Sequence, residues 1–174
     1  MKAARIHFGL AALIFFGLAP VVSLRSQAGS NVSGGPFSFF VGRWHCSGKF
    51  ASNAKAISAN LAFESILDGK FMLFRHDDEP PFNYHAWSEW GWDATTRQFV
   101  STIQDSTGGM RLFVSPGWDG QTLTWSGGNL PDSSDQQFVF ERLGDNNFRV
   151  SYFHKKDASW LAVDSSSCSK VGTN

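Results

Sequence analysis

Short runs of alternating apolar and polar residues, separated by turn-forming residues, fill the chain from Arg43 onward. Phe138 and Phe140 share one face of such a run, with Gln137, Val139 and Glu141 on the other, and Phe148 and Tyr152 share a face further along. A period of two places one face of each strand against a core and the other face toward solvent. No sustained helical period follows these runs, so the sequence favours hairpin-connected antiparallel strands over alternating strands and helices.

Turn chemistry divides this region into about ten predicted strands. Asp68-Gly69 and Asp119-Gly120 are strong hairpin signals. The expected strands are 43–50, 56–65, 70–76, 84–92, 97–105, 110–115, 121–126, 136–142, 147–154 and 159–168. Many short, evenly spaced strands favour a closed barrel, which leaves no exposed sheet edge. We therefore predict an all-β fold, a single antiparallel up-and-down β-barrel over residues 42–170, with a two-sheet sandwich as the alternative.

The only two cysteines lie in the first and last of these predicted strands. In an up-and-down barrel the first and last strands are neighbours, so Cys46 and Cys168 are expected to form a disulfide across the seam. The alternative is two unpaired thiols in the core. Such a disulfide persists in an oxidising compartment.

The first 28 residues have the pattern of a cleavable signal peptide. A basic start is followed by an apolar run, and Ser26-Gln27-Ala28 supplies the small residues of a cleavage site. We expect a secreted or periplasmic bacterial protein with no stable membrane anchor after cleavage; an uncleaved anchor is the alternative. Residues 29–41 form the expected flexible leader, and its apolar end, Phe37–Val41, is a candidate helical turn that plugs the barrel.

Charge argues against nucleic acid as a partner. The chain has 15 Lys and Arg against 15 Asp and Glu, and three of the basic residues lie in the expected signal peptide. The exported part is then slightly acidic and has no basic cluster beyond Lys155-Lys156, which is not a nucleic-acid or membrane-surface footprint.

Two stretches carry a family resemblance. Gly42-Arg43-Trp44 followed by Gly48 resembles the opening of lipocalin-like barrels and is close to the nitrobindin-like pattern. Glu89-Trp90-Gly91-Trp92-Asp93 and the strand after it resemble a bacterial family of uncharacterised proteins known as DUF1579. The resemblance implies a ten-stranded, lipocalin-like barrel with a cavity, whose floor is closed by Trp44. Nitrobindin-like proteins bind haem through a histidine near the C-terminus, and the last predicted strand here contains none.

The leading functional prediction is a non-enzymatic barrel that binds a small apolar or amphipathic ligand, with no cofactor. The chain has 17 Phe and 7 Trp, enough for an apolar cavity, and a few polar groups in such a cavity are typical of a small-molecule site. The predicted polar and aromatic wall is Arg75, His85, Trp87 and Glu89, and the predicted apolar wall is Leu112, Trp125, Phe140 and Tyr152.

Three alternatives remain open. An acid–base enzyme would use His85 and Glu89 inside the cavity. A haem protein would use His76, His85 or His154 as an axial ligand. The run Arg75–Glu79 with His85 holds metal-ligating side chains, although a solvated loop at the barrel mouth explains it equally. A Cys46 nucleophile is not favoured, because its neighbour His45 points to the opposite face of the strand.

Overall fold

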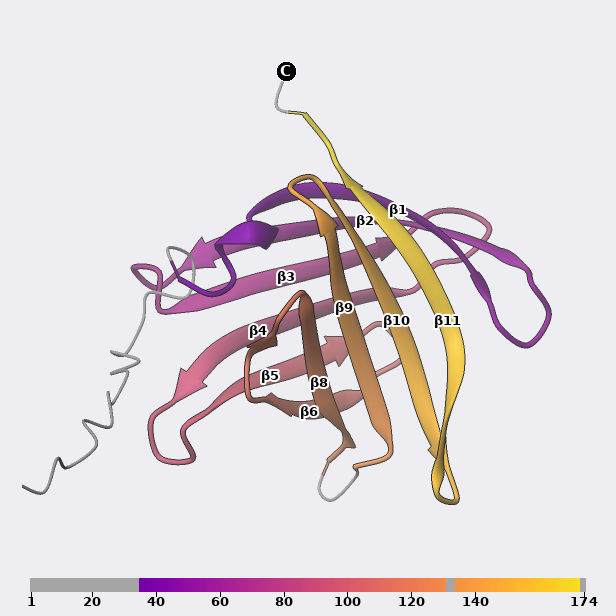
Figure 1. Cartoon of the computed structure of the whole chain (residues 1–174). Helices are drawn as coiled ribbons and strands as arrows, with labels where there is room; N and C mark the ends of the chain where they lie inside the picture. Colours follow the sequence, from indigo (N-terminus) through magenta and orange to yellow (C-terminus); the bar gives the residue numbers. More distant parts are fainter. Residues whose placement is uncertain (1–34, 131–133, 173–174) are drawn as a thin grey trace, which may run out of the picture.

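A ten-stranded antiparallel barrel is the architecture of the chain in this computed structural model, which describes residues 35–130 and 134–172 (Figure 1). The barrel strands are β1 (Gly42–Phe50), β2 (Ala56–Ile66), β3 (Phe71–Asp78), β4 (His85–Asp93), β5 (Gln98–Asp105), β6 (Met110–Ser115), β8 (Thr122–Asn129), β9 (Gln136–Gly144), β10 (Asn147–Lys156) and β11 (Ser159–Lys170). A two-residue strand, β7 (Trp118–Asp119), pairs with β8 alone. The all-β prediction is confirmed.

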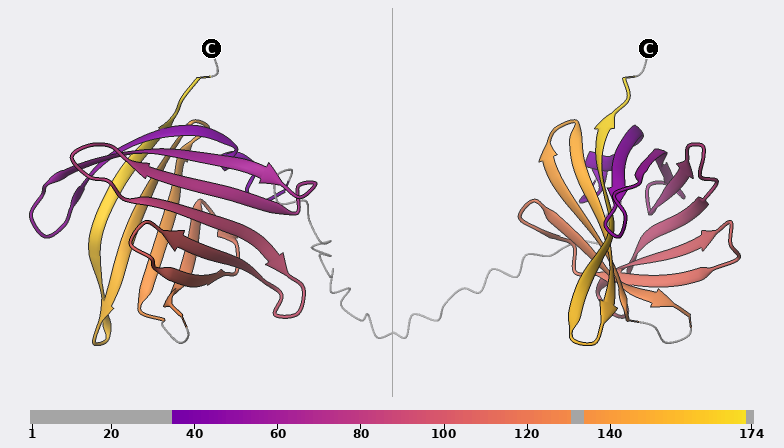
Figure 2. Two further views of the ribbon diagram at one scale, coloured as in Figure 1. Left: turned by 180° about the vertical axis from the view of Figure 1, so that it is seen from behind. Right: turned by 90° about the vertical axis from the view of Figure 1, so that its right-hand side faces the viewer.

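The barrel closes at two places. Sequential strands pair as a meander, β1 pairs with β11, and β6 pairs with β8, so the sheet returns on itself and the sandwich alternative is wrong. Figure 1 shows β2–β6 crossing behind β8–β11 at a steep angle, and Figure 2 shows the same wrapping from two further sides. Strand tilt of this kind accompanies barrel closure.

Glycines allow a close approach at both closures. A side chain at Gly48 would meet the Ser165 carbonyl oxygen of β11, with its Cβ only 2.1 Å away. A side chain at Gly127 would meet the Leu112 carbonyl oxygen of β6 at 2.0 Å. Glycine is therefore required wherever these backbones pack without an intervening side chain.

The disulfide joins the β1–β11 seam. Cys46 lies directly opposite Cys168 in the register, with their Cα atoms 4.0 Å apart, and the two sulfurs are bonded. Both cysteines are buried. The predicted Cys46–Cys168 pairing is confirmed, and no free cysteine is present among the described residues.

One end of the barrel is sealed by a short helix that precedes β1. The predicted turn at Phe37–Val41 holds the 3-10 helix η1 (Ser38–Phe40), and Phe37 and Phe40 are completely buried. The Trp44 indole Nε1 donates to the Phe40 carbonyl at 2.7 Å, which satisfies its polar atom inside the core. The aromatic rings around Phe40 within 6 Å belong to Phe39, Phe63, Trp90, Trp118, Phe140 and Phe148.

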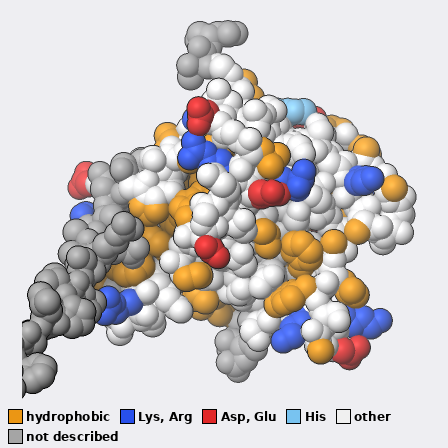
Figure 3. All heavy atoms as spheres, in the orientation of Figure 1, with side chains coloured by type: hydrophobic (Ala, Val, Ile, Leu, Met, Phe, Trp, Pro, Cys, Tyr) orange, Lys and Arg blue, Asp and Glu red, His pale blue; other side chains and the backbone are white. Residues whose placement is uncertain are grey.

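The outer surface carries mixed charges. Figure 3 shows single basic and acidic side chains scattered among polar and apolar ones on the face seen in Figure 1. No helix among the described residues has the length and apolar character needed to cross a bilayer. The predicted signal peptide, residues 1–28, lies outside the described residues, as does the leader up to residue 34.

Candidate functional site

The barrel encloses a cavity of about 610 Å³ beyond the aromatic seal. Trp90 and Trp125 separate the two regions, because both rings contact Phe37 of the seal and both line the cavity. Other lining residues, among them Asp78, Tyr84 and Asp105, lie at the strand ends that carry the β3–β4 and β5–β6 connections. The barrel therefore has an aromatic floor and an opposite polar end, which we call the mouth.

The floor is apolar but contains one satisfied polar group. Its rings belong to Phe74, Trp90, Phe113, Trp125, Phe138 and Phe140. The Trp90 Nε1 atom donates to the Ser88 hydroxyl at 2.9 Å, and Ser88 shares a further hydrogen bond of 2.8 Å with Ser101. Ser88 satisfies the N–H of the large ring, and Ser101 in turn pairs the Ser88 hydroxyl.

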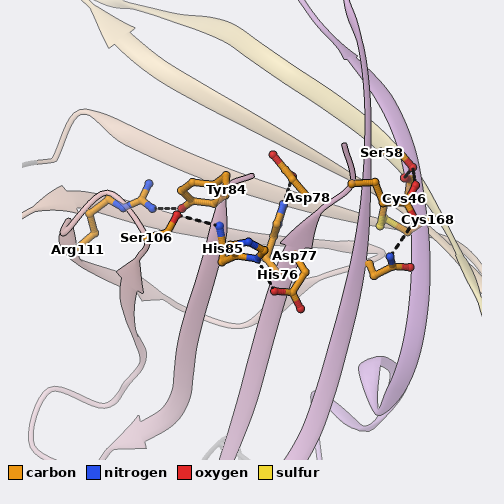
Figure 4. Close-up of polar contacts among 12 residues, drawn as sticks. Cys46, Ser58, His76, Asp77, Asp78, Tyr84, His85, Ser106, Arg111 and Cys168 are labelled. Atoms are coloured by element: carbon orange, nitrogen blue, oxygen red, sulfur yellow. Dashed lines mark hydrogen bonds and ion pairs between the residues drawn. A yellow bond between two sulfur atoms is a disulfide. The ribbon is translucent and has the colours of Figure 1, made fainter. Parts of the chain in front are cut away.

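A buried ion pair lies at the mouth. The Arg111 Nη2 atom of β6 donates to the Asp105 carboxylate at 2.9 Å. It also donates to the Tyr84 hydroxyl (Figure 4). The side chains of Arg111 and Asp105 are only 12% and 6% exposed. Burial raises the pKa of Asp105, but hydrogen bonds from Thr107 and the Gly109 backbone, with the Arg111 charge, outweigh it and lower the pKa below its ordinary value. Asp105 is therefore a fixed negative charge.

Two further carboxylates, Asp78 and Asp164, face the mouth from β3 and β11. On β3 the Asp78 carboxylate lies 2.7 Å from the His76 Nε2 atom, and the His76 ring packs edge-on against Tyr84. On β11, Asp164 lies opposite Tyr152 of β10. Burial raises the pKa of Asp164 to about 6, which the attraction of His76 only partly offsets. Burial likewise raises the pKa of the Tyr152 hydroxyl.

Three polar atoms of the lining are buried without a hydrogen-bond partner in the described chain. They are the Trp125 Nε1 atom, the Arg111 Nε atom and the Gln136 Oε1 atom. An unpaired polar atom in a protein interior costs about 1–3 kcal/mol. The mostly apolar wall thus holds three unpaired polar atoms, two donors and one acceptor, that are buried in the protein.

Three residues of the expected polar wall, Arg75, His85 and Glu89, do not line the cavity, because β3 and β4 have the opposite phase. His85 is 54% exposed and pairs with Asp77, and Trp87 is 57% exposed beside the Arg75 guanidinium, 5.4 Å from the ring centre. Glu89 is also exposed, although Trp87 borders the cavity. Ala86, Ser88 and Trp90 point inward instead, since the lumen already holds the rings of the facing strands and accommodates only two small residues and one large one.

Three of the four residues of the expected apolar wall line the cavity, and Leu112 does not. Trp125, Phe140 and Tyr152 line the cavity, as the alternation predicts, and their contact with a ligand stays a prediction. Leu112 faces outward because its neighbour Arg111 takes the interior position. The Asp105 and Tyr84 partners make that burial of a charge possible.

The lining residues that the sequence did not identify as a ligand wall include His76, Asp78, Gln136 and Asp164. For Gln136 a signal was present, since it shares the inward phase of Phe138 and Phe140. For Asp164 the signal was its spacing from Cys168, which lies on the same face of β11 four residues later; the pairing of β10 with β11 slips only beyond Asp164, between Tyr152 and Phe153.

The three alternatives fare differently. The acid–base pair of His85 and Glu89 is wrong, because both side chains face solvent and four residues along a strand separate them by roughly 13 Å. Of the proposed haem ligands only His76 lines the cavity, and its Nε2 atom is engaged by Asp78. His154 is exposed beside Asp135. Within residues 35–130 and 134–172, no group of three or more His, Cys, Asp or Glu side chains is arranged to hold a metal ion.

Comparison of the chain with models of known protein families gives no match, and comparison with curated proteins gives none either.

Proposed function

We propose that this protein is an exported barrel that binds a small amphipathic molecule inside its cavity. The observation that carries the proposal is the cavity itself, about 610 Å³ with an aromatic floor and a polar mouth. This volume falls within the roughly 300–1,000 Å³ of small-molecule sites, which are mostly apolar with a few placed polar groups.

The unpaired polar atoms support the same proposal. Trp125 on the floor and Arg111 at the mouth each offer a buried donor, and Gln136 offers a buried acceptor. A ligand that pairs with these atoms gains more than its apolar area alone provides, because it relieves the cost of leaving them unpaired. A purely apolar ligand would leave that cost in place.

Export is part of the proposal. A Cys46–Cys168 disulfide suits an oxidising extracellular or periplasmic compartment, and the first 28 residues carry the signal-peptide pattern. Membership of the DUF1579 family, which the sequence resembles, is likewise a proposal; it would add a lipocalin-like relationship but no ligand.

The test is native mass spectrometry of the purified protein against a panel of apolar and amphipathic molecules. The informative variant is Ala59→Phe, which places a ring in the cavity wall on β2. Its matched control is Ala56→Phe, the same change at an exposed position three residues earlier. Thermal unfolding of both variants establishes that they fold.

We expect ligand adducts on the wild type and on Ala56→Phe and their loss in folded Ala59→Phe, because the added ring occupies ligand volume. Equal binding by both variants would place the ligand elsewhere on the protein. A wild type that binds nothing from the panel would contradict the proposed function.

A further inference from the structure

Asp164 differs from the other acidic groups of the cavity. Asp105 is paired with Arg111, and Asp78 is paired with His76. Asp164 lines the same cavity but forms no hydrogen bond or ion pair with any described residue. A partly buried carboxylate without a partner is unfavourable, and a positively charged group brought against it removes that penalty.

The charge balance of the cavity points in the same direction. Its lining contains three aspartates, whereas Arg111 is its single lysine or arginine, and the Arg111 charge is already used by Asp105. The His76 ring is already paired with the Asp78 carboxylate. The mouth is therefore net negative once Asp164 ionises, which disfavours a ligand carboxylate or phosphate and favours a cation.

The strands beside Asp164 carry an unpaired buried acceptor and two stacked aromatic rings. Gln136 of β9 is 4% exposed, and its Oε1 atom is buried in the lining without a partner. Between Gln136 and Asp164 lie the rings of Phe138 and Tyr152, stacked 4.8 Å apart. Aromatic faces attract cations, so this side of the cavity presents the Asp164 carboxylate beside an aromatic surface.

We propose that the ligand carries a protonated amine, with Asp164 as its counter-ion beside the aromatic rings of the β9–β11 wall. This inference rests on the proposed function, since it names the chemical class of that ligand. An ammonium group has only donors, so it complements acceptors and not the donors at Trp125 and Arg111. A neutral oxygen elsewhere in the same ligand accepts from those donors without adding negative charge.

Binding of the amine then depends on pH. Asp164 must be ionised, and burial sets its pKa at about 6 in the free protein. The titratable groups that face it are His76 and Asp78 on β3 and Tyr152 on β10. Affinity for an amine is therefore expected to increase between pH 5 and about 7.5, as Asp164 loses its proton.

The experiment compares three probes of equal chain length, octylamine, 1-octanol and octanoate, by titration calorimetry at pH 7.5. The variant is Asp164→Asn, which keeps the shape of the side chain and removes its charge. The control is Asp77→Asn, which removes an exposed carboxylate of the outer face paired with His85. Circular dichroism and thermal unfolding verify that each protein folds.

We expect wild type and Asp77→Asn to bind octylamine at least about ten-fold more tightly than octanoate. We expect Asp164→Asn to lose that preference while it retains 1-octanol. Equal affinities for octylamine and octanoate in the wild type, or an unchanged preference in Asp164→Asn, would overturn this inference and leave the proposed function standing. Failure of all three probes to bind folded wild type would contradict both.

Discussion

Reduction of the seam disulfide is expected to lower the stability of the barrel strongly. The bond joins residues 122 positions apart, so it closes almost the whole folded chain into one loop. In the chain-entropy model a loop of that length restricts the unfolded state by about 5 kcal/mol. For a domain of this size, the corresponding decrease in the melting temperature is roughly 10–20 °C.

The assay compares urea unfolding of the oxidised protein with that of the same protein in a reducing buffer. This comparison keeps every side chain, so no cavity contributes to the difference. The Cys46→Ala, Cys168→Ala double variant gives a second measure. Its control is the Ser47→Ala, Ser167→Ala double variant, which changes the next register pair on the exposed face of the same two strands.

We expect a difference of about 4–5 kcal/mol between the oxidised and reduced proteins, and little change in the serine control. A difference below about 1 kcal/mol with complete reduction would refute the reasoning. It would mean that the unfolded chain keeps β1 and β11 close together without the bond.

Three further predictions concern the seal, the closure and the mouth. Phe40→Ala is expected to destabilise the protein by about 3–5 kcal/mol, because a fully buried ring leaves a cavity in the seal; urea unfolding measures it, and a loss under 1 kcal/mol would contradict it. Gly127→Ala is expected to lower the melting temperature far more than Gly144→Ala, whose new methyl would have no atom within 4 Å; equal effects would contradict a tight β6–β8 contact. Asp164→Asn is expected to stabilise the protein above about pH 6. The pKa of Asp164 is raised from 3.8 to about 6 on folding, so the wild type loses stability as pH rises through that range, by up to about 3 kcal/mol. Unfolding at pH 4 and pH 7.5 tests the sign, and a variant equally stabilised at both would contradict it.

The strand order and the disulfide were predictable because both follow from local signals. Turn residues divide the chain, and period-two alternation then fixes which residues of β9 and β10 face the core, as at Phe140 and Phe148. The partners of Cys46 and Cys168 follow from closure of the meander, since the first strand must meet the last.

The site was less predictable, because its residues are placed by contacts between distant strands. On β4 both faces carry large groups, and the choice of Trp90 over Trp87 for the interior depends on the rings of Phe37 and Trp125 that surround it. At β6 a charge rather than a leucine turns inward, because Arg111 finds the Asp105 carboxylate on β5. Such contacts join residues of different strands, so the alternation of residues within one strand does not reveal them.

Because η1 blocks one end of the barrel, the two ends of the molecule differ, and this determines where a label or tether can be attached without blocking the cavity. The described chain begins at this end, and it also finishes there, where the Val171 amide donates to the Arg43 carbonyl at 2.8 Å at the start of β1. Tethers, fluorophores or fusion partners attached at either end of the described chain therefore lie far from the mouth. The protein can be immobilised through either end of the described chain on a sensor surface with its entrance facing the solution.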